Sequence, residues 1–286
     1  MPAQLIALMT AISYASCLVC ARRGLRYSTP MTAAWISAIV QTIALWSAVF
    51  LTGGIPQVSP TAAILFAIVG ILQLGTRLFA YTGVDKIGAS RSSTLQATSP
   101  LYSAVIAITI LDEETGIEVL MGTLLVVLGI ILISWRPEER ASTYRRWHVL
   151  LPLAASLLTG INHPIRRYAL MISNQPLFLT ALMGTVSLTC VAAYLALPST
   201  QQLVWNRKAL LPLLATGLFE TLGILTVIIA LSVGPVVVVA PIAATYPLWV
   251  LLGTVIFSRD LEQVNMRTFS ATLSIVVGTT AIYLAN

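Results

Sequence analysis

Hydrophobic residues in this sequence form long continuous blocks separated by short polar segments. Apolar and polar positions do not alternate within the blocks, as they would in the strands of a membrane barrel. A helix rises about 1.5 Å per residue, so about 20 apolar residues are needed to cross roughly 30 Å of hydrocarbon. The pattern therefore predicts ten transmembrane helices, at residues 3–21, 31–52, 61–83, 87–111, 117–135, 148–170, 176–197, 208–232, 235–257 and 267–285.

The composition points in the same direction. Of the 286 residues, 57% are hydrophobic and 9% are charged, whereas about 25% are charged in a typical soluble domain. The first block has no basic segment before it and no small-residue cleavage site after it, so we expect a retained helix rather than a signal peptide. Cys17, Cys20 and Cys190 all fall within predicted helices, where we expect packing residues and not disulfide or metal ligands.

Lysine and arginine residues are distributed unevenly between the two sides of the predicted membrane domain. The loops after the first, third, fifth, seventh and ninth helices contain 13 of the 16 basic residues. The opposite side contains only Arg166 and Arg167, and the remaining residue, Arg77, lies within the third helix. Because cytoplasmic loops are enriched in basic residues, the sequence predicts a multi-pass plasma (inner) membrane protein with both termini outside. The basic residues form no single surface, so no nucleic-acid partner is expected.

The sequence also resembles itself at an offset of 147 residues. The matching positions are Pro100-Leu101-Tyr102 with Pro247-Leu248-Trp249, Gly70 with Gly217, and Glu113 with Asp260. This match predicts two related halves, residues 1–140 and 141–286, with five helices each. Because five is an odd number, the second half would be inverted relative to the first. Inverted repeats around a central cavity are common in secondary transporters, in which two similar halves can exchange conformations.

These features resemble the drug/metabolite transporter superfamily, in particular the ten-helix EamA-like transporters. The segments that carry the resemblance are Ser99-Pro100-Leu101-Tyr102-Ser103, Leu111-Asp112-Glu113-Glu114 and Gly122 through Gly129, echoed by Tyr246-Pro247-Leu248-Trp249, Ser258-Arg259-Asp260 and Gly278. The resemblance implies a basket in which spans one, three, four, six, eight and nine surround a cavity, with spans five and ten peripheral. It also implies export of a small metabolite. Members of the family are usually drawn with cytoplasmic termini, which differs from the orientation predicted by the basic residues.

Two ionisable residues lie near the middle of predicted spans, Arg77 in the third and Glu220 in the eighth. Charged side chains are costly in hydrocarbon, so they usually face the bundle interior and have a partner. In the repeat alignment Glu220 corresponds to Gln73, one helical turn before Arg77, and Tyr81 extends the same stripe. One hypothesis is that Arg77 and Glu220 bind the charged ends of a zwitterionic substrate, or that Glu220 relays a coupling proton. The alternative is a buried ion pair that only fixes helix packing.

Other polar and aromatic positions extend this candidate cavity. They are Gln96, Ser99, Tyr102, His163, Tyr246 and Trp249. His163 could relay a coupling proton, because histidine exchanges protons near neutral pH, although Arg166 and Arg167 place it close to a membrane surface. A proline inside a helix leaves one carbonyl without its donor, and such carbonyls can become ligands. The candidate helix-breaking residues are Pro100, Pro164, Pro241 and Pro247. In the alternative interpretation, serine and threonine only hold helices together and proline only kinks them.

The sequence contains no phosphate-binding P-loop, no His-Glu-x-x-His zinc motif and no nucleophile elbow. We therefore expect no cofactor, no metal and no catalytic residue, and a solvated helix cap at Asp112, Glu113 and Glu114. The predicted function is a secondary transporter, an exporter of a small metabolite such as an amino acid, whose partners are the lipid bilayer, the substrate and a coupling proton. The alternatives are multidrug efflux, nucleotide-sugar or phosphometabolite antiport, a membrane-embedded enzyme acting on lipid-like substrates, and a scaffold subunit. The sequence leaves the oligomeric state open.

Overall fold

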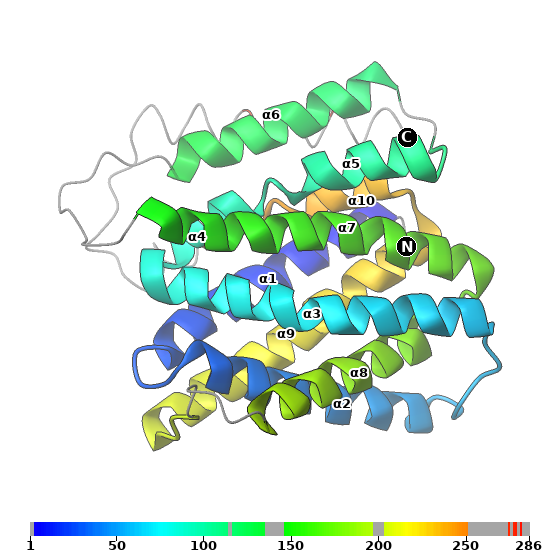
Figure 1. The fold of residues 1–286 in the computed structure, drawn as a ribbon. Coiled ribbons are helices and arrows are strands. Elements are labelled where there is room, and N and C mark those ends of the chain that lie inside the picture. The colour runs from blue at the N-terminus through cyan, green and yellow to red at the C-terminus, as the bar shows by residue number, and fades with distance from the viewer. Residues whose placement is uncertain are drawn as a thin grey trace.

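The computed structural model describes residues 3–113, 116–134, 146–196 and 203–250, together with residues 274, 277, 278 and 281. Within these ranges every regular element is a helix (Figure 1). The helices are α1 (Ala3–Gly24), α2 (Pro30–Leu51), α3 (Pro60–Ile87), α4 (Ala89–Gln96), α5 (Ser99–Ile110), α6 (Ile117–Ser134), the short 3₁₀ turn η1 (Arg146–Val149), α7 (Leu150–Ile172), α8 (Pro176–Ala196), α9 (Arg207–Val233) and α10 (Val236–Ala243). The predicted all-helical class is confirmed. The predicted tenth span lies outside the described residues except for four positions.

Five of the described helices are long and apolar enough to cross a membrane: α1, α2, α3, α8 and α9. The helix α6 and the segment Val236–Val250 contain shorter apolar stretches. The helix α7 has 23 residues, which is long enough, but it has polar residues along one face, including Asn162, His163 and Arg166. The helix α7 is therefore less apolar than the other long helices because the face that it turns toward the interior is polar.

The predicted fourth span is not one continuous helix. Residues 97 and 98 form a turn between α4 and α5, and Pro100 stands in the first turn of α5, where its missing N–H costs no helical bond. The Thr98 hydroxyl donates to the Leu95 carbonyl at 2.7 Å and so satisfies one acceptor at the end of α4. The single span expected over 87–111 is thus corrected to two helices with a break at its centre.

The ninth span has the same break 147 residues later. Residues 244 and 245 form a turn after α10, and helix resumes at Tyr246 with Pro247 as its second residue. The Thr245 hydroxyl donates to the Ile242 carbonyl at 2.8 Å, as Thr98 does to Leu95. Pro247 therefore stands where Pro100 does, at the restart of a broken span.

The other two candidate helix-breaking prolines do not interrupt their helices. Pro164 lies inside α7, which continues to Ile172, and Pro241 lies inside α10. Proline is tolerated within membrane helices where neighbouring groups satisfy the freed carbonyl. The prediction that Pro164 and Pro241 break helices is therefore wrong, because the breaks occur where a threonine can cap the preceding helix.

The helices pack in pairs that correspond between the first and second parts of the chain. The helix α1 packs along α9, and α7 packs along α3; α2 contacts both α8 and α9, and α3 also contacts α8. The helices α3 and α8, and α9 and α2, can approach closely because a glycine lies where each pair crosses. A Cβ added at Gly70 of α3 would lie 2.7 Å from the Met183 carbonyl oxygen of α8, and one at Gly217 of α9 would lie 3.0 Å from the Ser37 Cα of α2.

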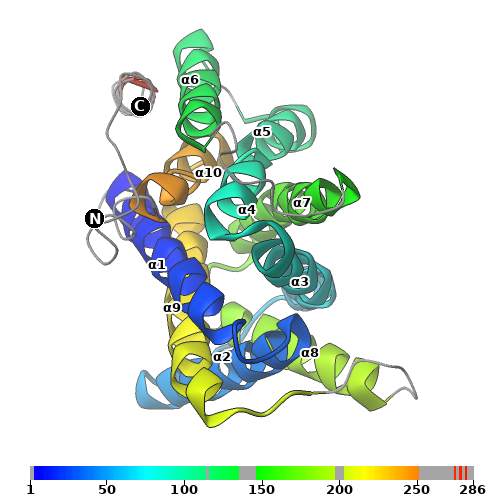
Figure 2. The same ribbon diagram turned by 90° about the vertical axis from the view of Figure 1, so that its left-hand side faces the viewer.

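The helix α6 lies at the edge of this arrangement. Its neighbours among the described elements are α4, α5 and α10. Figure 2 shows α6 beside α5 and on the opposite side of the molecule from α2 and α8. The helices α1, α3, α7 and α9 and the two broken spans thus form the centre of the molecule, and this is where the candidate site lies.

Candidate functional site

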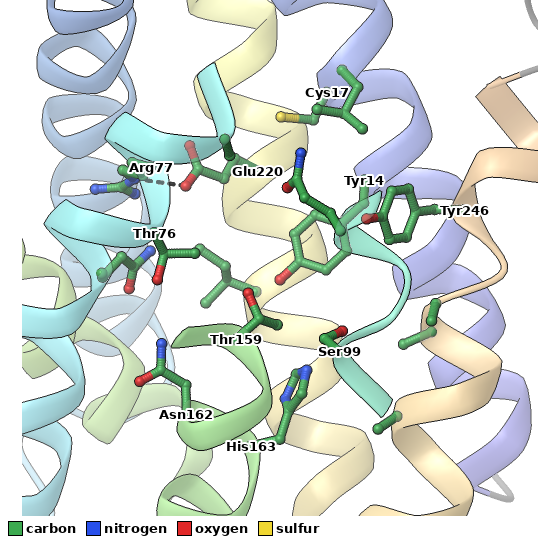
Figure 3. Close-up of a pocket in the computed structure, with 18 of the residues that line it drawn as sticks. Tyr14, Cys17, Thr76, Arg77, Ser99, Thr159, Asn162, His163, Glu220 and Tyr246 are labelled. Carbon is green, nitrogen blue, oxygen red and sulfur yellow. Dashed lines mark hydrogen bonds and ion pairs between the residues drawn. The ribbon is translucent and has the colours of Figure 1, made fainter. Parts of the chain in front are cut away.

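A cavity of about 120 Å³ lies where α1, α3, α7 and α9 meet the two helix breaks. Eight of the ten cavity residues predicted from the sequence line it: Gln73, Arg77, Tyr81, Gln96, Ser99, His163, Glu220 and Tyr246. Figure 3 shows Arg77 and Glu220 facing each other on one wall, Tyr14 and Tyr246 on another, and Asn162 and His163 projecting from α7. Residues from seven helices, α1, α3, α4, α5, α7, α9 and α10, therefore converge on one cavity.

Arg77 and Glu220 form a buried ion pair. The Arg77 Nε donates to Glu220 Oε1 at 2.6 Å, and the two side chains are 2% and 9% exposed. The Arg77 Nη1 donates to Ser187 Oγ at 3.0 Å, and its Nη2 donates to Gln41 Oε1. The Tyr81 hydroxyl donates to the second carboxylate oxygen, Glu220 Oε2, at 2.5 Å. In this conformation both charged groups therefore satisfy each other, although both also border the cavity.

The network around this pair connects four helices. Gln41 of α2 and Ser187 of α8 bind the Arg77 guanidinium of α3, whose counter-ion belongs to α9. The Gln73 Nε2 also donates to Gln41 Oε1, at 3.4 Å. The sequence analysis missed Gln41 and Ser187. The available signal was a polar residue near the middle of an otherwise apolar span, which is costly in lipid unless it is paired inside the bundle.

The helix α7 contributes a second set of polar groups, and here the sequence prediction was wrong. Arg166 was assigned to the membrane surface, but α7 continues six residues beyond it, about 9 Å. Its side chain is buried, with 4% of the residue exposed, and it lines the cavity together with His163 and Asn162. Thr159, Asn162, His163 and Arg166 follow the spacing of one helical face, which was the signal that could have identified them.

The next residue, Arg167, points away from this cavity toward α9 and the end of α5. Its Nη1 donates to the Leu231 carbonyl at 2.8 Å, and its Nε lies 3.8 Å from Glu113 Oε1. The Glu113 carboxylate in turn accepts the backbone N–H groups of Val236 and Val237, at 3.0 and 3.2 Å. Glu113 therefore caps the N-terminus of α10, a position that favours negative charge, and the solvated cap expected before the fifth span is corrected.

Aromatic and polar side chains at the helix breaks complete the cavity wall. The Tyr246 hydroxyl donates to the Ser93 carbonyl at 3.1 Å, and its ring meets that of Tyr14 edge to face at 6.2 Å. The Gln96 Nε2 donates to Ser92 Oγ at 2.9 Å. The carbonyls expected as free ligands near the breaks are thus partly used by the protein itself, since Thr98 binds the Leu95 carbonyl.

Two predicted cavity residues lie outside its lining. Tyr102 is 36% exposed and packs against α7, where a Cβ added at Gly160 would lie 2.5 Å from the Tyr102 Cβ. Trp249 is partly buried against the apolar core, and neither residue belongs to the cavity wall. Both residues follow a helix break, which changes the direction of the residues after it.

Comparisons with known proteins agree with this fold. Residues 1–135 match the model of the EamA-like transporter family. No curated protein matches the chain by sequence. A solved structure described as "Crystal structure of protein" is similar with a TM-score of 0.78 and 14% sequence identity, and the match covers 99% of this chain and 99% of the other. At that identity the likeness concerns the fold alone. Residues 1–135 therefore match a domain of the EamA-like transporter family, in the drug/metabolite transporter superfamily, and this match indicates a multi-pass membrane protein and implies a secondary transporter.

Proposed function

We propose that this protein exports a small metabolite, such as an amino acid or a related amphipathic compound, by alternating access. The observation that carries the proposal is the central cavity, in which charged, polar and aromatic side chains from six of the predicted spans surround about 120 Å³ at the level of two helix breaks. Irregular backbone at membrane depth is tolerated where it is buried in protein or lines a cavity, and transporters bind substrates at such breaks.

The architecture proposed for this function has ten transmembrane helices in two inverted halves, residues 1–140 and 141–286. Three observations support it. The breaks at residues 97–98 and 244–245 are 147 positions apart and have the same threonine bond. Gly70 and Gly217, at the same offset, occupy equivalent crossings. The pairs α1–α9 and α7–α3 are also related by exchange of the two halves.

Two sets of contacts join helices beyond the cavity, one where α5 finishes and one where α1 finishes. At the end where α5 finishes, Glu113 joins the N-terminus of α10 to Arg167 of α7. At the end where α1 finishes, the Arg22 Nη1 donates to the Val84 carbonyl of α3 at 3.0 Å. Opening one set while the other holds would expose the cavity to one side only, which is the requirement for alternating access.

The proposed location is the plasma (inner) membrane, with both termini outside. This orientation is supported by the 13 basic residues in the loops of one side. Burial of Arg166 within α7 leaves only Arg167 to be counted on the opposite side. The asymmetry that predicts the orientation is therefore greater than the sequence alone indicated.

The experiment that tests the function begins with thermal unfolding of the purified protein in the presence of amino acids, nucleosides, sugars, phosphosugars and organic cations. A ligand at 100 times its dissociation constant should add about 2.7 kcal/mol of apparent stability. Each hit is then tested for counterflow in proteoliposomes, with Asp85→Asn, which alters an exposed ion pair, as the matched control. Saturable counterflow in wild type and control supports the proposal. Stabilisation without any counterflow contradicts it.

A further inference from the structure

Arg166 is a buried cation that lacks a carboxylate partner among the described residues. Its Nε is buried without a hydrogen-bond acceptor, and its Nη2 meets only the Met183 sulfur, at 3.7 Å. A thioether is a weak acceptor and carries no charge. Burying an ionised group without a partner is strongly unfavourable. The burial of Arg166 therefore indicates that another group compensates its charge.

The net charge of the cavity lining indicates the charge of a partner for Arg166. Its formally charged residues are Arg77, Arg166 and Glu220. Glu220 is fully engaged, because Arg77 and Tyr81 occupy its two oxygens. The lining therefore has a net charge of +1, and that charge belongs to Arg166. A single negative charge on a bound molecule would neutralise it.

Two further unsatisfied polar atoms lie on the same helix face. Asn162 Oδ1 and His163 Nδ1 are both buried without a hydrogen-bond partner, and both residues line the cavity with Arg166. Asn162 lies four positions and His163 three positions before Arg166, so the three side chains share one face of α7. Three incompletely satisfied groups on one face form a polar site directed at the cavity.

Part of the remaining wall is apolar and can contact an apolar body of the molecule. Leu18, Ile224 and four alanines face the same volume, with the Tyr14 ring beside them. A cavity of about 150 Å³ in another protein holds one benzene molecule, so 120 Å³ suits an apolar group of that size or slightly smaller.

We infer that Arg166 binds the carboxylate of a small monoanionic organic acid with a compact apolar body, and that an amino group on this compound is dispensable. A phosphate monoester carries about −1.5 to −2 charges and would exceed the single positive charge available. The inference deepens the proposed function, because it names the chemical class of the transported compound. Binding at Arg166 is nevertheless measured separately from transport.

The test uses four probes with the same branched body on the purified protein. These are 4-methylpentanoate, leucine, 3-methylbutylamine and 3-methylbutyl phosphate, and the readout is the apparent dissociation constant from thermal unfolding. Both carboxylates should bind the wild type, and the amine should not. Stronger binding of the amine or of the phosphate than of 4-methylpentanoate would overturn the inference.

Arg166→Gln separates a ligand-binding role from a structural one. The affinity for 4-methylpentanoate should fall by about tenfold or more, as expected for loss of a hydrogen bond to a charged group. In the absence of ligand the same variant should unfold at a temperature equal to or above that of wild type, because it removes an uncompensated buried charge. Arg167→Gln is the matched control and should keep the affinity but unfold at a lower temperature, since Arg167 binds the Leu231 carbonyl. Unchanged affinity in Arg166→Gln overturns the inference.

Proteoliposome uptake of labelled 4-methylpentanoate distinguishes the two proposals. Binding that depends on Arg166 without any uptake would contradict the transport function and leave the anion site established. Uptake of a metabolite at equal rates in wild type and Arg166→Gln would support transport and overturn the role of Arg166. Uptake that is lost in Arg166→Gln and retained in the Asp85→Asn control supports both.

Discussion

Removing one member of the Arg77–Glu220 pair should destabilise the protein more than removing both charges. The two side chains are 2% and 9% exposed, and Arg77 Nε lies 2.6 Å from Glu220 Oε1. Glu220→Gln leaves the Arg77 charge buried with only the neutral acceptors Gln41 and Ser187. Breaking a buried pair in this way typically costs about 3–5 kcal/mol. A loss of about 3 kcal/mol changes the unfolding equilibrium by more than a hundredfold.

The double variant should recover part of this loss. With glutamine at both positions no buried charge remains, and the two amides can still form hydrogen bonds with their neighbours. We expect the double variant to be more stable than either single variant, with a coupling energy of at least about 2 kcal/mol. Contacting residues commonly show coupling of this size, whereas distant residues add within about 0.5 kcal/mol.

The assay is unfolding in mixed detergent micelles, titrated with a denaturing detergent and followed by circular dichroism. The Asp85–Lys86 pair provides the control, with its atoms 3.0 Å apart and its side chains 28% and 47% exposed. Asp85→Asn should cost no more than about 1 kcal/mol, as exposed pairs generally do. Single substitutions at Arg77 and Glu220 that cost less than about 1 kcal/mol each, and that simply add in the double variant, would refute the reasoning.

Three further predictions concern packing, helix capping and topology. Gly160→Ala should cost about 1–3 kcal/mol, because its methyl group would lie 2.5 Å from the Tyr102 Cβ, whereas at Gly75 the nearest atom is a leucine methyl at 3.1 Å and the same change should be tolerated. Equal unfolding midpoints for these two variants would contradict the packing. Glu113→Gln should lower stability by about 1–2 kcal/mol in the same assay, because one charged cap of the α10 N-terminus is lost; an unchanged midpoint would show that the cap contributes little. When fused to the C-terminus, a reporter that functions only outside the cytoplasm should be active. Activity of a reporter that functions only in the cytoplasm would reject the predicted orientation.

The sequence alone determined the helical class and the pairing at the centre of the molecule. In hydrocarbon a backbone must satisfy its own hydrogen bonds, so apolar blocks of about 20 residues have few options besides helix. Arg77 and Glu220 could be predicted to meet, because an isolated charge is costly in lipid and the 147-residue offset placed both on equivalent helices. Most of the cavity residues followed from their positions on the same stripes.

Only the tertiary structure decided where the helices break and which neutral groups complete the site. Arg166 lies inside the span predicted over 148–170, but only the packing of α7 shows that its side chain is buried at the cavity and does not reach the membrane surface. Tyr102 and Trp249 lie outside the cavity wall, whereas Ser99 and Tyr246, which also follow the breaks, line it. Gln41 and Ser187 became partners of Arg77 through the rotation of α2 and α8 about their axes. That rotation depends on contacts between helices, such as those at Gly70 and Gly217, and no local pattern of residues specifies it.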